Sequence, residues 1–154
     1  MGEEEDRTKA KQSALRMLAF RPRSKQEIAD KLSEKGFAAA IIQPTLDYLS
    51  SCGYVNDVVF ARQEALSLAK GKGWGIERIV LALRSRKVPA DIVRDTIAEL
   101  RESYAEEEAA STIVKRRFSH IDLHTASPQE KQRLAGHLRR RGFSWETINR
   151  VMKL

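Results

Sequence analysis

The sequence is poor in cysteine, in aromatic residues and in long apolar runs, and each shortage excludes a class of protein. Cys52 is the only cysteine, so the chain can form no internal disulfide and no cysteine-based zinc site. We expect this side chain to be a small apolar filler. No run of about 18 apolar residues occurs, and the acidic start lacks the basic and apolar segments of a secretory signal. We therefore expect a cytoplasmic protein with no membrane partner. Aromatic residues make up only 6% of the chain, which favours thin aliphatic cores between helices.

Basic residues exceed acidic ones. The 154 residues include 28 Lys and Arg against 21 Asp and Glu, a formal net charge of +7. Such an excess favours an acidic partner, and nucleic acid is the commonest one for a basic helical protein of the cytosol. Charge alone does not identify that partner.

The residues that usually carry catalysis or bind cofactors form no recognisable set. His120 and His124 have the spacing of a metal-binding pair on a helix, with Asp122 between them. Apolar residues alternate with them in an expected loop, however, so we expect no metal site. The glycine-rich stretch 71–75 follows no apolar strand and does not match the phosphate-binding loop of nucleotide-binding enzymes. With no Ser-His-Asp or Cys-His set evident, we predict that the chain is not an enzyme and needs no cofactor.

One helical pattern recurs three times. In the first copy Ser24 opens a capping box, Leu32 lies on the apolar face of the helix that follows, and Gly36 supplies a left-handed stop. The pattern returns around Leu83 and again around Leu138. A single amphipathic bundle would also place leucines at helical spacing. It would not repeat the order of cap, helix, turn and helix.

The recurrence predicts an all-α chain built from three tandem three-helix repeats. We expect a flexible acidic N-terminus at 1–9, followed by repeats at 10–55, 56–102 and 103–154. Helices joined in this way are similar to helix-turn-helix folds.

Basic residues lie where these repeats would expose them. The candidates for contact with phosphates or with an acidic protein are Arg62, Lys70, Lys72, Arg78, Arg84, Arg86, Lys87, Arg116, Arg117, Arg139, Arg140 and Arg141. We expect Arg84, Arg86 and Lys87 to face the solvent and to make such contacts. For the segment 115–117, contact and simple hydration both stay open.

The two tryptophans have different expected roles. Trp74 either stacks on a base or packs against Ile79 or Tyr54. We expect Trp145, in the first turn of the last helix, to pack between helices.

Four stretches of the sequence occur together in one known family. They are Arg21-Pro22-Arg23-Ser24 with Lys35-Gly36-Phe37, Gly53-Tyr54-Val55-Asn56-Asp57 with Phe60-Ala61-Arg62, Gly71-Lys72-Gly73 with Ile79, Leu83 and Val88, and Arg141-Gly142-Phe143-Ser144 with Ile148. In this order and spacing they resemble the RecX family of bacterial recombination regulators. The chain departs from the family pattern at Ile76, where proline is usual, and at Lys87, where glycine is usual. These departures concern the shape of loops and leave the fold unchanged.

The resemblance implies a fold and a function. The fold is three tandem three-helix repeats in an elongated curved array. The implied function is negative regulation of the RecA recombinase in DNA repair and the SOS response, through binding of the RecA filament on single-stranded DNA. The protein would lower ATP hydrolysis and strand exchange by hindering filament growth or promoting disassembly, as a monomer and without catalysis. The alternative is a helix-turn-helix regulator of duplex DNA, but residues 38–40 and 89–91, which begin the third helices, offer poor chemistry for reading bases.

Overall fold

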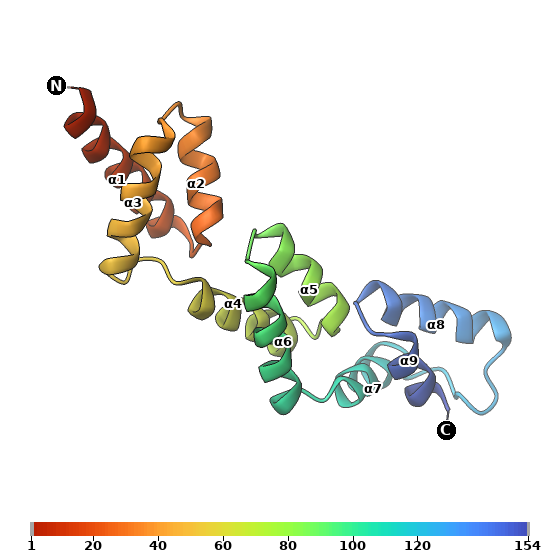
Figure 1. Ribbon diagram of the computed structural model, residues 1–154. Helices are drawn as coiled ribbons and strands as arrows, with labels where there is room; N and C mark the ends of the chain where they lie inside the picture. Colours follow the sequence, from red (N-terminus) through yellow and green to blue (C-terminus); the bar gives the residue numbers. More distant parts are fainter. Residues whose placement is uncertain (1, 154) are drawn as a thin grey trace. The chain divides into compact units, whose positions relative to one another are not determined.

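The computed structural model describes residues 2–153, and over this range the chain is helical with no strand. The prediction of an all-α fold is confirmed (Figure 1). The helices are α1 (Gly2–Phe20), α2 (Lys25–Glu34), α3 (Ala39–Ser51), α4 (Asp57–Leu66), the π-helical segment η1 (Ser67–Gly71), α5 (Ile76–Ser85), α6 (Ala90–Ser103), α7 (Glu106–Arg117), α8 (Pro128–Arg140) and α9 (Trp145–Met152). Met1, part of the segment expected to be flexible, and Leu154, the end of the expected third repeat, lie outside the described residues.

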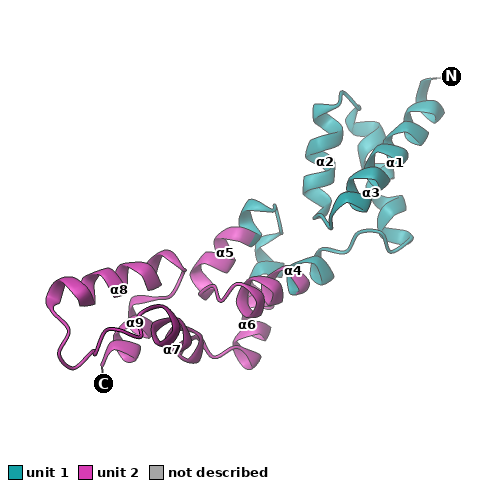
Figure 2. Cartoon of the chain, turned by 180° about the vertical axis from the view of Figure 1, so that it is seen from behind, with its two compact units in different colours: residues 1–62, 83–93 teal, residues 63–82, 94–154 magenta. Residues whose placement is uncertain are grey.

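The chain forms two compact units, which Figure 2 draws in different colours. Unit 1 comprises residues 1–62 and 83–93, and unit 2 comprises residues 63–82 and 94–154. The division falls inside α4, α5 and α6. The boundaries of three repeats stay a prediction.

Unit 1 contains the first three-helix group, in which α1, α2 and α3 pack together (Figure 1). Ile28 and Leu32 of α2 are fully buried against Leu49 of α3 and the small side chains of α1. The capping box is present, because the hydroxyl of Ser24 accepts from the amide of Glu27 while the Glu27 carboxylate accepts from the amide of Ser24. The apolar spacing and the cap therefore determine where α2 begins and which face it buries.

The N-terminal segment is helical from Gly2 onward, so α1 includes residues 2–9, where the sequence predicts flexibility. The acidic first turn suits the positive end of the helix dipole, and the pairs Arg7–Glu3 and Lys9–Glu5 each join successive turns. Ala10, the next residue, is fully buried and anchors the helix. Whether the segment moves stays a prediction about its dynamics.

Cys52 is exposed where α3 ends, so the expectation that it fills a core is wrong. The reason lies in the helix itself. Leu49 is the last fully buried residue of α3, and the chain after it passes to the surface.

Unit 2 contains a second three-helix group, formed by α7, α8 and α9. Its core includes Ile113 of α7, Leu134 and Leu138 of α8, Phe143 in the turn after α8, and Ile148 of α9, all buried. Capping boxes and hydroxyl caps again define the helix starts, at Ser127 for α8 and at Ser144 for α9.

The turn after α5 has the same left-handed conformation as the turns after α2 and α8, although it has no glycine. Gly36 after α2 and Gly142 after α8 have φ angles of 95° and 100°, and Lys87 after α5 has a φ of 64°. The departure from the family pattern at Lys87 therefore leaves the turn in the left-handed region. A residue with a Cβ is held there at a cost of roughly 1–2 kcal/mol.

Candidate nucleic-acid interface

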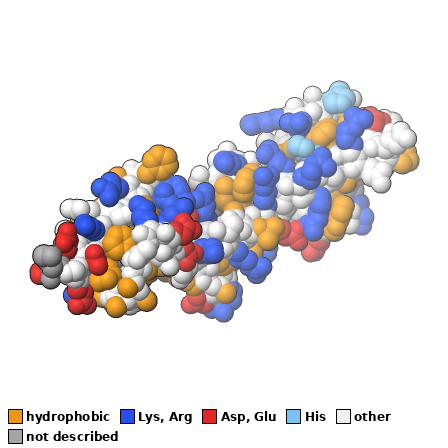
Figure 3. Space-filling view, turned by 90° about the horizontal axis from the view of Figure 1, so that it is seen from above, with side chains coloured by type: hydrophobic (Ala, Val, Ile, Leu, Met, Phe, Trp, Pro, Cys, Tyr) orange, Lys and Arg blue, Asp and Glu red, His pale blue; other side chains and the backbone are white. Residues whose placement is uncertain are grey.

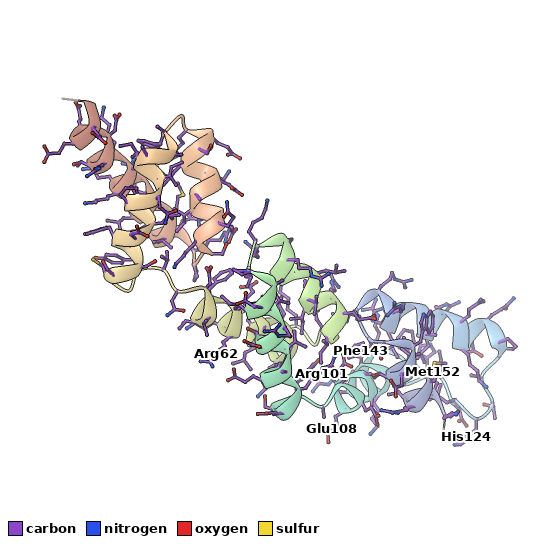
Figure 4. The ribbon with its side chains drawn as sticks, viewed as in Figure 1. Arg62, Arg101, Glu108, His124, Phe143 and Met152 are labelled. Atoms are coloured by element: carbon purple, nitrogen blue, oxygen red, sulfur yellow. The ribbon has the colours of Figure 1, made fainter. Side chains whose placement is uncertain are left out.

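The candidate contact residues divide between the two units. Unit 1 holds Arg62, Arg84, Arg86 and Lys87, and unit 2 holds the remainder. On the face drawn in Figure 3, Lys and Arg side chains are widespread, while Asp and Glu side chains gather in a few patches. Arg62 is exposed on α4, where Figure 4 labels it.

In unit 1, only Arg84 of the expected basic trio is exposed and without an ion pair among the described residues. Arg86 is half-buried, with its Nη1 3.8 Å from Oε2 of Glu27, and its carbonyl oxygen accepts a hydrogen bond from the Ser24 hydroxyl. Lys87 is exposed, but its Nζ lies 3.5 Å from Oδ2 of Asp30. The expectation that all three face the solvent is therefore wrong for Arg86, because its side chain and backbone join the end of α5 to the start of α2.

Glu27 is the acidic centre of this contact and serves two arginines. Besides Arg86, it accepts a 2.7 Å bond from Nη2 of Arg21. Arg23 lies beside them: burial lowers its pKa, the nearby charge of Arg21 lowers it further, and Glu27 opposes the shift. Arg21 and Arg23 are missing from the sequence-based candidates. Their position just before the capping serine was the available signal.

In unit 2, Arg78 and Arg139 join α5 to the turn between α8 and α9. Arg139 pairs with Glu77, and its Nη1 donates a 2.9 Å bond to the carbonyl oxygen of Phe143. Nη1 of Arg78 donates to the carbonyl oxygen of Arg140 at 3.4 Å. Both arginines therefore already have structural roles, whatever else they contact.

Both tryptophans contact basic side chains of the same unit. The guanidinium of Arg78 lies 3.8 Å from the centre of the Trp74 ring, and Nζ of Lys72 lies 5.3 Å from it. Trp145 is 54% exposed, with the Arg139 guanidinium 5.5 Å from its ring centre. The expected packing of Trp145 between helices is therefore wrong, because the inner face of α9 is filled by Thr147 and Ile148. In each pair the cation is attracted to the negative face of the ring.

An open cleft of about 630 Å³ gathers most of the other unit 2 candidates. It lies between η1 with the loop after it, the link from α6 to α7, and one face of α7. Its basic lining residues are Lys70, Lys72, Arg116, Arg117 and Arg141. Glu108, at the start of α7 (Figure 4), is the only carboxylate in the lining. Arg140 is exposed and lies outside this lining.

Two buried nitrogen atoms at the α8 end lack a hydrogen-bond partner among the described residues, Nε of Arg141 and Nε2 of His137. Burial lowers the pKa of His137, and the charges of Arg117, Arg141 and Arg140 lower it further. Tyr104, which also lines the cleft, donates a 2.7 Å bond to the carbonyl oxygen of Trp74. Burial, with a smaller contribution from Glu106, raises the pKa of Tyr104 to about 12, so this phenol stays protonated and keeps donating.

His120 and His124 lie on the loop between α7 and α8, and no group of three His, Cys, Asp or Glu side chains within residues 2–153 is placed to hold a metal ion. No helix in the described range is long and apolar enough to cross a membrane.

The fold defines a helical protein with three-helix domains and exposed cationic side chains. Comparison with known families identifies two of the domains: residues 10–49 match the first three-helix domain of RecX, and residues 105–152 match the third. The chain is 36% identical to the regulatory protein RecX of Syntrophotalea carbinolica over 139 residues, 90% of each chain. It is 32% identical to the regulatory protein RecX of Pelodictyon phaeoclathratiforme, over 92% of this chain and 85% of that one. The chain belongs to the RecX family of regulatory proteins.

Solved structures show the same fold. The crystal structure of RecX from Lactobacillus salivarius superposes with a TM-score of 0.82 at 20% identity, covering 97% of this chain and 96% of that one. A second crystal structure of a regulatory protein RecX gives a TM-score of 0.77 at 18% identity and covers 99% of this chain. The predicted family and fold class are therefore confirmed.

Proposed function

We propose that this chain is a negative regulator of the RecA recombinase that binds the RecA filament on single-stranded DNA. It lowers ATP hydrolysis and strand exchange by hindering filament growth or by promoting disassembly. The observation that carries the proposal is a set of cations in a member of the RecX family that have no ion-pair partner among residues 2–153, namely Lys70, Lys72, Arg116 and Arg117. Exposed cations without carboxylate partners are available to neutralise phosphates.

The protein acts by binding and not by turnover. A recombinase filament on DNA presents the same protein surfaces and DNA phosphates again and again along its length. A chain of small three-helix repeats, at 10–55, 56–102 and 103–154, offers several contact surfaces to such a polymer. We therefore propose a cytoplasmic monomer that needs no cofactor.

Single-stranded DNA within a filament suits the chain better than duplex DNA read by sequence. Base reading in the major groove needs Asn, Gln, Arg or Ser at the start of a recognition helix. Helix α3 begins at Ala39 after the N-cap residue Ala38, and α6 begins at Ala90. These methyl groups cannot distinguish base pairs by hydrogen bonds.

The exposed Cys52 provides a site for one fluorescent label in a direct test. The labelled protein is titrated with RecA filaments held on oligo-dT by a non-hydrolysable ATP analogue, and separately with free RecA, free oligo-dT and a duplex. The proposal predicts that the filament binds more tightly than any of the other three. Filament affinity no greater than that for oligo-dT, or preference for a duplex, would contradict it.

A further inference from the structure

The cleft in unit 2 brings several basic side chains together. Some arginines elsewhere in the unit have carboxylate partners: Arg139 pairs with Glu77, and Arg150 pairs with Glu107 at 2.9 Å and Glu146 at 2.6 Å. Within residues 2–153, none of the five basic side chains that line the cleft makes an ion pair.

The acidic first turn of α7 contributes one carboxylate to the cleft lining, that of Glu108. Glu106 lies outside the lining and accepts hydrogen bonds from the amide of Ile76 at 2.6 Å and from the hydroxyl of Thr147 at 3.3 Å. Glu107 is held by Arg150. Five cations and one carboxylate therefore line the cleft, so positive charge accumulates in a concave site, where its field is focused on an incoming anion.

The cleft also has an uncharged wall. Ala69, Ala109 and Ile113 line it together with the backbone of Gly71 and Gly73. A volume of about 630 Å³ is typical of a small-ligand site and accommodates one nucleotide. A flat base can cover the small apolar side chains while its phosphate meets the arginines of α7.

Arg141 adds a guanidinium to the cleft lining. Hydrogen bonds from a guanidinium to a phosphate are among the strongest that proteins make. Its Nε is buried, so a phosphate in the cleft would meet the terminal nitrogens of this side chain.

We propose that this cleft binds one nucleotide of a single strand, with its phosphate on Arg116, Arg117 and Arg141 and its base against the α7 wall. A single strand suits the cleft because its bases are free to enter, whereas a duplex keeps them stacked inside. The inference rests on the proposed function, since it assigns the DNA strand of the filament to one site. The cleft is expected to bind free single-stranded DNA as well, so the inference can be tested without the recombinase.

The test measures binding of the full chain to fluorescein-labelled oligo-dT by anisotropy over a range of salt concentrations. Arg116→Ala with Arg117→Ala removes two cleft cations. Lys115→Ala with Arg133→Ala removes two exposed cations that do not line the cleft, one of them on the same helix. Thr112→Trp fills the cleft from an exposed position without changing charge. Circular dichroism and thermal unfolding of each variant establish that it folds.

The expected result is roughly tenfold weaker binding for the cleft pair, with a salt slope smaller by roughly 1.4 because two phosphate contacts are lost. Thr112→Trp is also expected to weaken binding, and the control pair to stay within about threefold of wild type. Equal losses of affinity for the cleft pair and the control pair would show that DNA binds a diffuse basic surface and not this cleft. Tighter binding of poly-glutamate than of oligo-dT would assign the cleft to an acidic protein. In either case, binding of the wild-type chain to the filament would still support the proposed function. If the wild-type chain bound oligo-dT through the cleft but did not bind the filament, the proposed function would be wrong and the cleft assignment would stand.

Discussion

The amide of Gly75 donates a 2.8 Å hydrogen bond to the carbonyl oxygen of Arg141, which fastens the loop after η1 to the turn between α8 and α9. The amide of Glu77 donates to the carbonyl oxygen of Gly142 at 3.1 Å beside it. Backbone meets backbone here, and a Cβ on Gly75 would lie 2.2 Å from the carbonyl carbon of Gly142. The close approach of the two backbone segments requires glycine at both positions 75 and 142. The same backbone contact positions Arg141 at the cleft.

Gly75→Ala is therefore expected to destabilise the chain by roughly 1–3 kcal/mol, because no flexible side chain can yield to the new methyl group. The matched control is Gly71→Ala, whose Cβ would meet only the Ser67 hydroxyl at 3.9 Å. Urea unfolding of both variants checks the prediction. Similar midpoints for the two would mean that the loop does not depend on this contact.

Lys87→Gly is expected to stabilise the chain by about 1 kcal/mol, since glycine removes the strain of a φ of 64°. The lost ion pair with Asp30 offsets little of this, because both side chains are about half exposed, at 56% and 43%. Lys87→Ala loses the same ion pair and keeps the strain, so it serves as the control. A melting temperature of the glycine variant at or below that of the alanine variant would refute the account of this turn.

Arg84→Ala and Arg86→Ala are expected to act differently, although both remove one charge from the same turn. Arg84 is exposed, so its loss should leave stability within about 0.5 kcal/mol of wild type and weaken filament binding. Arg86 is one of two arginines on the largely buried Glu27, so its loss should lower stability by roughly 1 kcal/mol. Thermal unfolding and filament binding of the two single variants separate the effects. Equal stability losses would contradict the assignment.

Acid is expected to destabilise unit 2 through His137. Burial and three neighbouring arginines lower its pKa in the folded protein, so the unfolded chain, with an ordinary pKa of about 6.5, takes up the proton first. The stability contribution is present above pH of about 6.5 and is lost as the pH falls through the lower folded pKa. Melting temperatures at pH 7.5 and 5.5 should differ more for wild type than for His137→Leu. An identical difference would mean that another group causes the pH dependence.

The sequence was sufficient to predict features that depend on near neighbours. Ser24 caps its helix and Gly36 adopts a left-handed turn, as predicted, and the same two features return with the repeated pattern at Ser127 and Gly142. These features follow from residues three or four positions apart, which a helix brings together whatever the rest of the chain does.

Features that depend on distant residues were missed. The sequence does not show that Arg86 meets Glu27, or that residues of η1 and α7 enclose one cleft with Arg141. The exposure of Trp145 was also missed, because helical spacing identifies an apolar stripe but not its edge. The candidate cations were found by their charge, and which of them lack an ion-pair partner became visible only in the folded chain.

The most direct test of the regulatory account is ATP hydrolysis by the cognate RecA on single-stranded DNA, at fixed salt, with this protein titrated from well below one molecule per RecA protomer. The account predicts inhibition at substoichiometric ratios without matching competition for free DNA, because one bound molecule affects many protomers of a filament. No inhibition, or inhibition only once enough protein is present to coat the DNA, would contradict it and favour a general DNA-binding protein.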